Sequence, residues 1–493
     1  TLDPIAPSGG SHATRDILRP VLPALFALDA ELRPQPELAA AWPGPDDIRL
    51  DPLSVDLELR EAAWSDGTPI TAADVRFSWE RLREGPTGAR YRPLRDVEVT
   101  GPRTLTLRFD RRVRRWWSLF SIDDMVLPAH AYGPGWENGP TVSAGPFSFE
   151  GWERGLSVRL RRNDAHWGTK ASAEAIDVTF VEDDETRIVL TERSELDVAW
   201  FEGDSNVGAR AAARGFEPTD GPALGGRVVA GAWAPAWWEL SWDPDRVPRE
   251  LARGLSAAVD RKLTPELLED SGQAMDGIPA RFPAPQPQRW GLPALPGPWP
   301  AESGVDAANR ALRDGQYQTG ASLRDGRGRE VDLRLAHPTG TASAIARFVH
   351  WQLRPLGLRL EVIGVQSDRL ERDWIPERRT DGYLVLRRAA DAPDVDAYRP
   401  DAPRPGRVPG IEELAERAGS AVSGAALRGR PVVGLGEAGW AAAQREMAES
   451  GYVVPLARVR TWLAVREGLV GPHPVGAASG PLWNAALWGS LGT

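Results

Sequence analysis

One stretch of the chain, residues 64–83, limits the fold more than any other because it specifies a turn and a capped helix in direct succession. The S-D-G sequence at 65–67 indicates a turn, since aspartate bonds its own backbone and glycine tolerates positive φ. Thr71 precedes Asp74 by three residues, which is the spacing of a capping box at a helix start. We therefore predict a strand end, a tight turn and an amphipathic helix over residues 71–83.

Alternating apolar and polar residues flank this helix on both sides, at 55–59 and at 105–109. A period of two residues is typical of a half-buried strand. Strand–helix–strand patterns recur farther along the chain, at 173–202 and at 330–365. Repeated alternation of strands and helices favours an α/β fold.

The composition narrows the class of protein. The chain has 493 residues, which is enough for two to four structural domains. Its net charge of −10 argues against a nucleic-acid-binding protein, because such proteins need a basic surface. The absence of cysteine rules out disulfides, thiolate nucleophiles and cysteine-based metal sites.

The sequence also bears on membrane insertion and export. It contains no run of about 18 apolar residues, so we predict no transmembrane helix. The chain starts at Thr1, without an initiator methionine or a signal-peptide pattern. We expect either that a signal has been removed or that the protein never carried one.

Sequence motifs for catalysis or metal binding are missing. There is no H-E-x-x-H, no P-loop and no G-x-S-x-G, and the six histidines are scattered singly. Adjacent acids such as Asp183 and Asp184 lack the face-to-face spacing that acid–base catalysis requires. We therefore expect no enzymatic activity, no metal site and no cofactor.

Two stretches resemble signatures of a known family. Residues 64–83 read W-S-D-G-T-P-I-T-A-A-D-V-R-F-S-W-E-R-L-R, which resembles a signature of the extracytoplasmic solute-binding proteins of ABC importers, in the dipeptide/oligopeptide/nickel-binding family 5. Residues 144–168 resemble a second signature of this family, with Ala144 in place of the common Thr and His166 in place of the common Tyr. Weaker matches extend the resemblance from Leu2 to Trp488.

The resemblance implies an α/β, two-lobed periplasmic-binding-protein type II fold with an extra subdomain inserted in the first lobe. Residues 1–43, 165–245 and 457–493 would form lobe I, residues 44–164 the inserted subdomain, and residues 246–456 lobe II. Two crossing strands would join the lobes, and the ligand would bind between them. Hinge closure would then be favoured, because only the closed form contacts the ligand on both sides.

The resemblance also implies a function. The chain would be a monomeric extracytoplasmic receptor, in the periplasm or lipid-anchored at the outer face of the cell membrane. It would bind a peptide-like or other small solute and deliver it to the ABC permease. Two alternatives stay open: an oligosaccharide-binding receptor of the same fold, and a receptor-like protein that has lost transport and acts as a carrier or interaction module. Departures from the family pattern at Ala144, Asp243 and Arg387-Arg388 keep the last alternative open.

A first set of candidate ligand contacts lies in residues 380–394, T-D-G-Y-L-V-L-R-R-A-A-D-A-P-D. This stretch resembles the family's "f-D-[ALM]-x-L-x-G-W-x-x-D-Y-x-D-P", in which the first Asp after the Trp forms a salt bridge with the ligand's α-ammonium group. That position is Asp391 here. Arg387 and Arg388 replace the Gly-Trp pair and offer guanidinium groups for a carboxylate or phosphate group.

A second set is the tryptophans of residues 232–245, A-W-A-P-A-W-W-E-L-S-W-D-P-D. Strand alternation puts Trp238 and Trp242 on one face and Trp237 and Glu239 on the other. Flat aromatic rings stack well on sugars and other ligands, so Trp237, Trp238 and Trp242 are candidate contacts, with packing in the core of the strand as the alternative. These stretches contain no histidine, so a nickel ligand is not expected.

Overall fold

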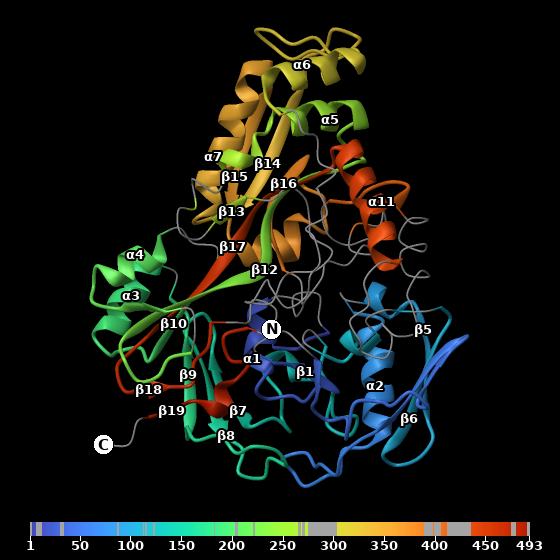
Figure 1. The fold of residues 1–493 in the computed structure, drawn as a ribbon, viewed down its shortest axis with the longest axis vertical. Helices are drawn as coiled ribbons and strands as arrows, with labels where there is room; N and C mark the ends of the chain where they lie inside the picture. Colours follow the sequence, from blue (N-terminus) through green and yellow to red (C-terminus); the bar gives the residue numbers. More distant parts are fainter. Residues whose placement is uncertain are drawn as a thin grey trace.

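The computed structural model of the chain describes residues 2–5, 12–29, 34–85, 88–111, 113, 116–121, 124–181, 183–202, 206–219, 222–264, 268, 272–274, 303–388, 398, 406–411, 435–474 and 480–490. Across these residues, helices and sheets alternate along the chain, as the sequence predicts (Figure 1). None of the helices within them combines the length and the apolar character that crossing a bilayer requires.

A four-stranded antiparallel sheet carries the stretch that the sequence analysis singled out. Its strands are β3 (Ile48–Leu50), β4 (Leu53–Glu58), β5 (Leu94–Val99) and β6 (Thr104–Phe109), in the order β3-β4-β6-β5. Helix α2 (Ala72–Leu82) packs on this sheet and buries Val75, Trp79 and Leu82. Thr71 is the N-cap of α2, so the predicted strands at 55–59 and 105–109 and the capped helix are confirmed.

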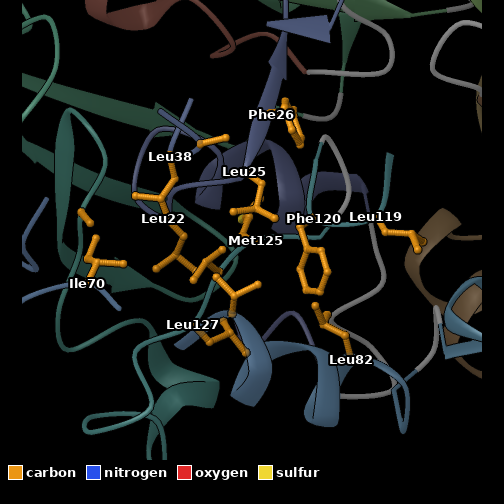
Figure 2. Close-up of a cluster of buried hydrophobic side chains, with 14 of the residues drawn as sticks. Leu22, Leu25, Phe26, Leu38, Ile70, Leu82, Leu119, Phe120, Met125 and Leu127 are labelled. Atoms are coloured by element: carbon orange, nitrogen blue, oxygen red, sulfur yellow. The ribbon is translucent and has the colours of Figure 1, made fainter. Parts of the chain in front are cut away.

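Smaller elements surround this sheet. A three-stranded sheet contains β7 (Phe147–Glu153), β8 (Ser157–Arg162) and β9 (Ala175–Thr179), and a two-stranded sheet pairs β1 (Phe26–Leu28) with β2 (Pro34–Pro36) after helix α1 (His12–Leu18). One hydrophobic cluster joins these parts and also takes in side chains of residues 482–488. Figure 2 shows part of this cluster, with Leu22, Leu25, Phe120, Met125 and Leu127 among its labelled side chains.

The largest sheet has eight strands. Six form the path β10-β17-β12-β16-β14-β15, while β11 (Glu217–Thr219) pairs with β12 and β13 (Gly272–Ala274) pairs with β17. The six are β10 (Val198–Glu202), β17 (Val453–Val465), β12 (Val228–Trp242), β16 (Gly382–Arg388), β14 (Asp332–Pro338) and β15 (Arg359–Val365). Strands β14 and β15 are parallel and are connected through helix α7 (Ala342–Leu353), so the unit predicted at 330–365 is confirmed.

The strand–helix–strand pattern at 173–202 has a different outcome. Its elements form as β9, α3 (Asp184–Glu192) and β10, but the two strands belong to different sheets. β9 continues the hairpin made by β7 and β8, whereas β10 pairs antiparallel with β17. The two strands of this pattern therefore do not form one βαβ unit, because pairing partners far along the chain decide where each strand goes.

The remaining elements cover the large sheet or its ends (Figure 1). They are α4 (Val207–Ala212), α5 (Arg249–Ala258), α6 (Val305–Asp314), α8 (Ser367–Arg369) with a π-helical turn (Leu370–Trp374), α11 (Leu435–Ser450), β18 (Leu469–Val470) and β19 (Gly489–Ser490). Short 3-10 turns occur at Gly88–Tyr91, Trp116–Ser118, Trp136–Asn138, Arg261–Leu263, Arg354–Leu356 and Ala485–Leu487.

Strands β12 and β17 connect two separate hydrophobic cores. Both are long, with 15 and 13 residues, and they run side by side from the α3–α4 region to the β14–β16 region (Figure 1). Val229 of β12 packs in a cluster with residues of α3 and α4, whereas Ala236 packs in a second cluster drawn from residues 236–459. The predicted division of the chain into lobe I, inserted subdomain and lobe II remains a prediction.

The pairing of β12 with β17 is irregular between these two cores. The register shifts between Trp233, which pairs with Arg460, and Trp237, which pairs with Arg458. Pro235 lies within the shift, and proline has no N–H to donate to a strand ladder. Such a bulge bends a strand and increases its twist locally, so the pair changes direction where it passes from one core to the other.

Candidate functional site

Four of the six predicted ligand contacts, Trp237, Trp238, Trp242 and Arg387, have described side chains and lie on β12 and its neighbour β16, where the register pairs Trp237 with Arg387. Side chains alternate between the two faces of a strand, and paired residues of antiparallel strands share a face. Trp237 and Arg387 therefore lie on one face of the sheet together with Glu239. We call this side the polar face of β12 and define it by Trp237, Glu239, Ser241 and Asp243.

Glu239 lies at the centre of the polar face and has no exposed surface. Its Oε1 accepts hydrogen bonds from Arg387 Nε at 2.8 Å and from Ser241 Oγ at 2.9 Å. Its Oε2 accepts hydrogen bonds from the Tyr398 hydroxyl at 3.0 Å and from Trp237 Nε1 at 3.2 Å. A buried carboxylate is tolerated only when it is both paired and hydrogen-bonded, and Glu239 meets both conditions.

Arg387 supplies the opposite charge and is itself 7% exposed. Its guanidinium carbon lies 5.5 Å from the centre of the Tyr398 ring, within the range of a cation–π contact. Burial acts to lower the pKa of Arg387, but attraction to Glu239 and Tyr398 and the hydrogen bond to Glu239 outweigh it, so the pKa is raised. Arg387 is therefore a permanent cation whose charge is matched by Glu239.

Tyr398 and Gly406, which lie outside β12 and β16, pack against this ion pair. Tyr398 is 2% exposed and accepts a hydrogen bond from the Val408 N–H at its carbonyl, at 2.8 Å. Gly406 has a φ of +82°, and a Cβ atom there would lie 2.9 Å from Arg387 Nη2 and 3.0 Å from Glu239 Oε1. The positive φ favours glycine at this position, and a side chain there would have to displace the ion pair, so the backbone of Gly406 packs directly against the pair.

A second buried ion pair lies at the end of the polar face. Arg407 Nη2 donates hydrogen bonds to Asp243 Oδ1 at 2.5 Å and to Asp245 Oδ2 at 3.0 Å. The Asp243 N–H donates to the carbonyl of Asp381 at 2.8 Å, which ties the end of β12 to the residue before β16. The segment around Gly406 and Arg407 is therefore attached to β12 at two successive positions.

Arg458 of β17 lies beside Trp237 on the side opposite Arg387, so the three residues form a row across neighbouring strands. It pairs in register with Trp237, so the two side chains share the polar face. Burial lowers the pKa of Arg458 to about 10, which still leaves its guanidinium protonated at neutral pH. Two buried arginines, Arg387 and Arg458, thus flank Trp237 from the two strands on either side of β12.

The predicted tryptophan contacts lie on different faces. Trp237 is 2% exposed and donates its indole N–H to Glu239. Trp238 and Trp242, which strand alternation places on the opposite face, are 5% and 0% exposed, and all three tryptophans belong to one hydrophobic cluster. The predicted alternation of these side chains is confirmed, and whether any of them contacts a ligand remains a prediction.

The structure brings Arg387 together with Trp237, but it does not describe the side chains of two of the predicted ligand contacts. Arg388 is the last residue of β16, and its side chain lies outside the described residues. Asp391, the predicted partner of a ligand ammonium group, also lies outside the described residues. The roles of both residues remain predictions.

Reasoning from the sequence missed three residues of this network: Glu239, Tyr398 and Arg407. Glu239 was placed on the correct face but was given no role. A signal for it existed, because a single acid interrupts an otherwise apolar strand in W-W-E-L-S-W. No comparable signal marks Tyr398 or Arg407, because each meets β12 only through tertiary folding.

A protein-built metal site needs several histidine or acidic side chains in one place. Within the described residues, no three such side chains come together as metal ligands. His166, which replaces a common family tyrosine, directs Nδ1 to the Ala144 carbonyl at 2.9 Å and packs beside Trp167.

Comparison with known proteins gives several relatives that are named for a peptide or dipeptide ligand. The chain is 24% identical over 221 residues to the dipeptide-binding protein DppE of Bacillus subtilis (strain 168). The alignment covers 39% of this chain and 40% of DppE, so the match spans about two fifths of the relative's own length.

Solved structures match over almost the whole chain. The periplasmic EDTA-binding protein EppA gives a TM-score of 0.78 at 20% identity, and the match covers 100% of this chain and 94% of EppA. The oligopeptide-binding protein AppA from Bacillus subtilis, in complex with a nonapeptide, gives 0.77 at 17% identity, with 98% and 95% covered. At these identities the similarity shows the fold alone, and it confirms the predicted α/β fold of the two-lobed periplasmic binding proteins.

The sequence profile of one family matches residues 33–401, which is well over half of the chain. Its description is "Bacterial extracellular solute-binding proteins, family 5 Middle". The chain therefore belongs to family 5 of the bacterial extracellular solute-binding proteins.

Proposed function

We propose that this chain binds a small, peptide-like solute between two lobes outside the cell membrane and delivers it to an ABC permease. The observation that carries the proposal is the pair of long strands, β12 and β17, which passes from one hydrophobic core into another. Two cores joined by continuous strands can change their relative orientation with little change inside either core. Such a hinge lets a ligand stabilise the closed arrangement without covalent chemistry.

Asp391 is the proposed partner of the solute's ammonium group. It lies four residues after Arg387, which is bound to Glu239 on β12. Its place in the sequence, shortly after a strand that is bound to β12, supports a role for Asp391 in contacting the solute.

The other candidate contacts have different roles in this proposal. Arg387 and Trp237 hold Glu239 and thereby shape the polar face of β12. Arg388 is the guanidinium proposed for an anionic group of the solute. Trp238 and Trp242 support the strand from its apolar side, because their rings are packed in the core.

An oligosaccharide ligand is the second candidate. It would need an aromatic platform, and Trp237, Trp238 and Trp242 are each 5% exposed or less. Stacking a sugar on these rings would require the strand to be uncovered. Their burial supports the peptide-like solute over the oligosaccharide. A carrier without transport would bind the same ligands but would not associate with a permease.

The experiment is a thermal-shift screen of the full chain against di- to pentapeptides, short oligosaccharides and nickel. A ligand that binds only the folded state raises Tm, and we expect the largest shift from a peptide. Asp391→Asn is then compared with Asp394→Asn, a neighbouring acid of the same segment. We expect affinity to fall by more than about tenfold in Asp391→Asn, because losing one partner of a buried charge pair typically costs 2–5 kcal/mol.

Other results would reject parts of this proposal. Equal affinities in Asp391→Asn and Asp394→Asn would reject the assignment of Asp391. A larger shift from an oligosaccharide would favour the second candidate. Tight ligand binding without stimulation of solute uptake by a reconstituted permease would favour the carrier.

A further inference from the structure

Glu239 is held in a fixed orientation by its own strand. Trp237 and Ser241 lie two residues before and after it on the same face, and both donate to its carboxylate. Two local donors orient the carboxylate but leave its negative charge uncompensated. A buried carboxylate without an opposite charge is strongly destabilising, so this position on β12 requires a cation.

The guanidinium group of Arg387 fills this position, and the groups around it are those that would surround a bound cationic ligand. The guanidinium of Arg387 bonds the carboxylate at 2.8 Å, and its carbon lies 5.5 Å from the centre of the Tyr398 ring. The backbone of Gly406 lies against it and leaves no room for a side chain. A carboxylate, an aromatic face and a close-fitting wall are what a protein uses to bind a guanidinium or ammonium group.

We propose that Glu239, Trp237, Ser241 and Tyr398 form a cation-binding subsite for guanidinium groups, which Arg387 occupies as an internal ligand. While Arg387 is in place, the subsite is closed to a cationic group of any solute. The pair therefore sets charge selectivity: the native chain rejects a solute that would place a second cation at the polar face of β12. This last consequence rests on the proposed function, whereas the subsite itself does not.

Removing the occupant tests the subsite. Arg387→Ala deletes the guanidinium and leaves a cavity lined by Glu239, so we expect a lower Tm than in the native chain. Millimolar methylguanidinium chloride should raise the Tm of Arg387→Ala toward the native value and leave the native chain unchanged, with sodium chloride at the same ionic strength as the reference. The matched control is the double variant Glu239→Gln/Arg387→Ala, which keeps the cavity but lacks the charge.

The comparison with the double variant decides whether the subsite exists. Stabilisation of Arg387→Ala but not of the double variant would establish the subsite. Equal shifts in the two variants, or no shift in either, would overturn it. If Arg387→Ala is recovered folded only when methylguanidinium is present during expression, that dependence supports the subsite. If it is never recovered, Arg387→Gln replaces it, with Glu239→Gln/Arg387→Gln as control and the same criteria.

A second measurement separates the subsite from the proposed function. For a peptide found in the ligand screen, an analogue with one added guanidinium group is compared with the parent. We expect the ratio of their affinities to shift by about tenfold toward the analogue in Arg387→Ala relative to the native chain. Rescue by methylguanidinium without this shift would leave the subsite standing and place the solute elsewhere, which would count against the proposed ligand site.

Discussion

Two buried carboxylates, Asp74 in the N-terminal region and Glu239 on β12, satisfy the same physical demand in opposite ways. Asp74 is 5% exposed and Glu239 has no exposed surface. Asp74 Oδ2 accepts the N–H of Thr71 at 2.8 Å, and its Oδ1 accepts the N–H of Ala129 at 2.9 Å. Asp74 thus relies mainly on uncharged backbone donors, whereas Glu239 relies on a buried cation.

The two carboxylates also differ in how far along the chain their partners lie. Asp74 has a local partner, the Thr71 N–H three residues away, whose hydrogen bond forms as the helix begins, and a second partner, the Ala129 N–H, 55 residues away. The Arg387 and Tyr398 partners of Glu239 are 148 and 159 residues away. A local cap stabilises its helix early in folding, because only a short loop must close. A remote ion pair contributes only after whole segments have docked. Three substitutions test this contrast, and a fourth tests a half-buried histidine outside both sites.

Glu239→Ala should have the largest effect. The substitution leaves the guanidinium of Arg387 buried without its carboxylate, which typically costs about 3–5 kcal/mol. Urea unfolding followed by tryptophan fluorescence measures the loss. The control is Glu98→Ala, which breaks the exposed pair with Arg108 and should cost about 0–1 kcal/mol. Similar losses in the two variants would contradict a special role for the buried pair.

Gly406→Ala should follow. A Cβ at this position meets Arg387 Nη2 and Ser241 Oγ at 2.9 Å, and alanine is strained at a φ of +82°. Together these costs should reach about 2–4 kcal/mol in the unfolding free energy. Gly410→Ala is the matched control, since Gly410 has a φ of +86° and a Cβ atom added there would meet nothing within 4 Å. If Gly410→Ala were equally destabilising, the contact with the ion pair would carry no energy.

Asp74→Ala should be less damaging than Glu239→Ala. Losing the helix cap costs about 1–2 kcal/mol, and the cost rises because the Ala129 N–H is left without this acceptor. The same urea titration checks the value. Asp183→Ala removes only a cap, the acceptor of the Thr186 N–H on α3, and should cost less than Asp74→Ala. A loss for Asp74→Ala above that for Glu239→Ala would break the comparison.

His166→Gln should have the smallest effect, and only in acid. Burial, reinforced by Arg60 and opposed by the hydrogen bond to Ala144, lowers the pKa of His166 below 6.5. As the pH falls below 6.5, the unfolded chain binds a proton before the folded chain does, so stability is lost until the folded pKa is passed. His166→Gln should flatten the decline in Tm below pH 6.5 and leave the slope above pH 7.5 unchanged. Identical slopes in acid would contradict the lowered pKa.

Much of the fold was predictable because its determinants are local. The turn at 65–67, the cap at Thr71 and the helix that follows depend on residues within a few positions of one another. Strands β14 and β15, before and after α7, likewise form at the residues where the sequence pattern predicts them. The pattern at 173–202 predicted its elements but not their sheets, because β9 and β10 find their partners in different parts of the chain.

The sequence by itself determined the capped helix, the alternating faces of β12 and, through its signatures, the family. Only the tertiary structure decided what the polar face of β12 holds. Strand alternation specifies which way Glu239 and Trp237 point, because it is a property of the backbone. It carries no information on which distant side chain arrives opposite them, and the arrival of Arg387, Tyr398 and Gly406 depends on the packing of segments more than 140 residues away.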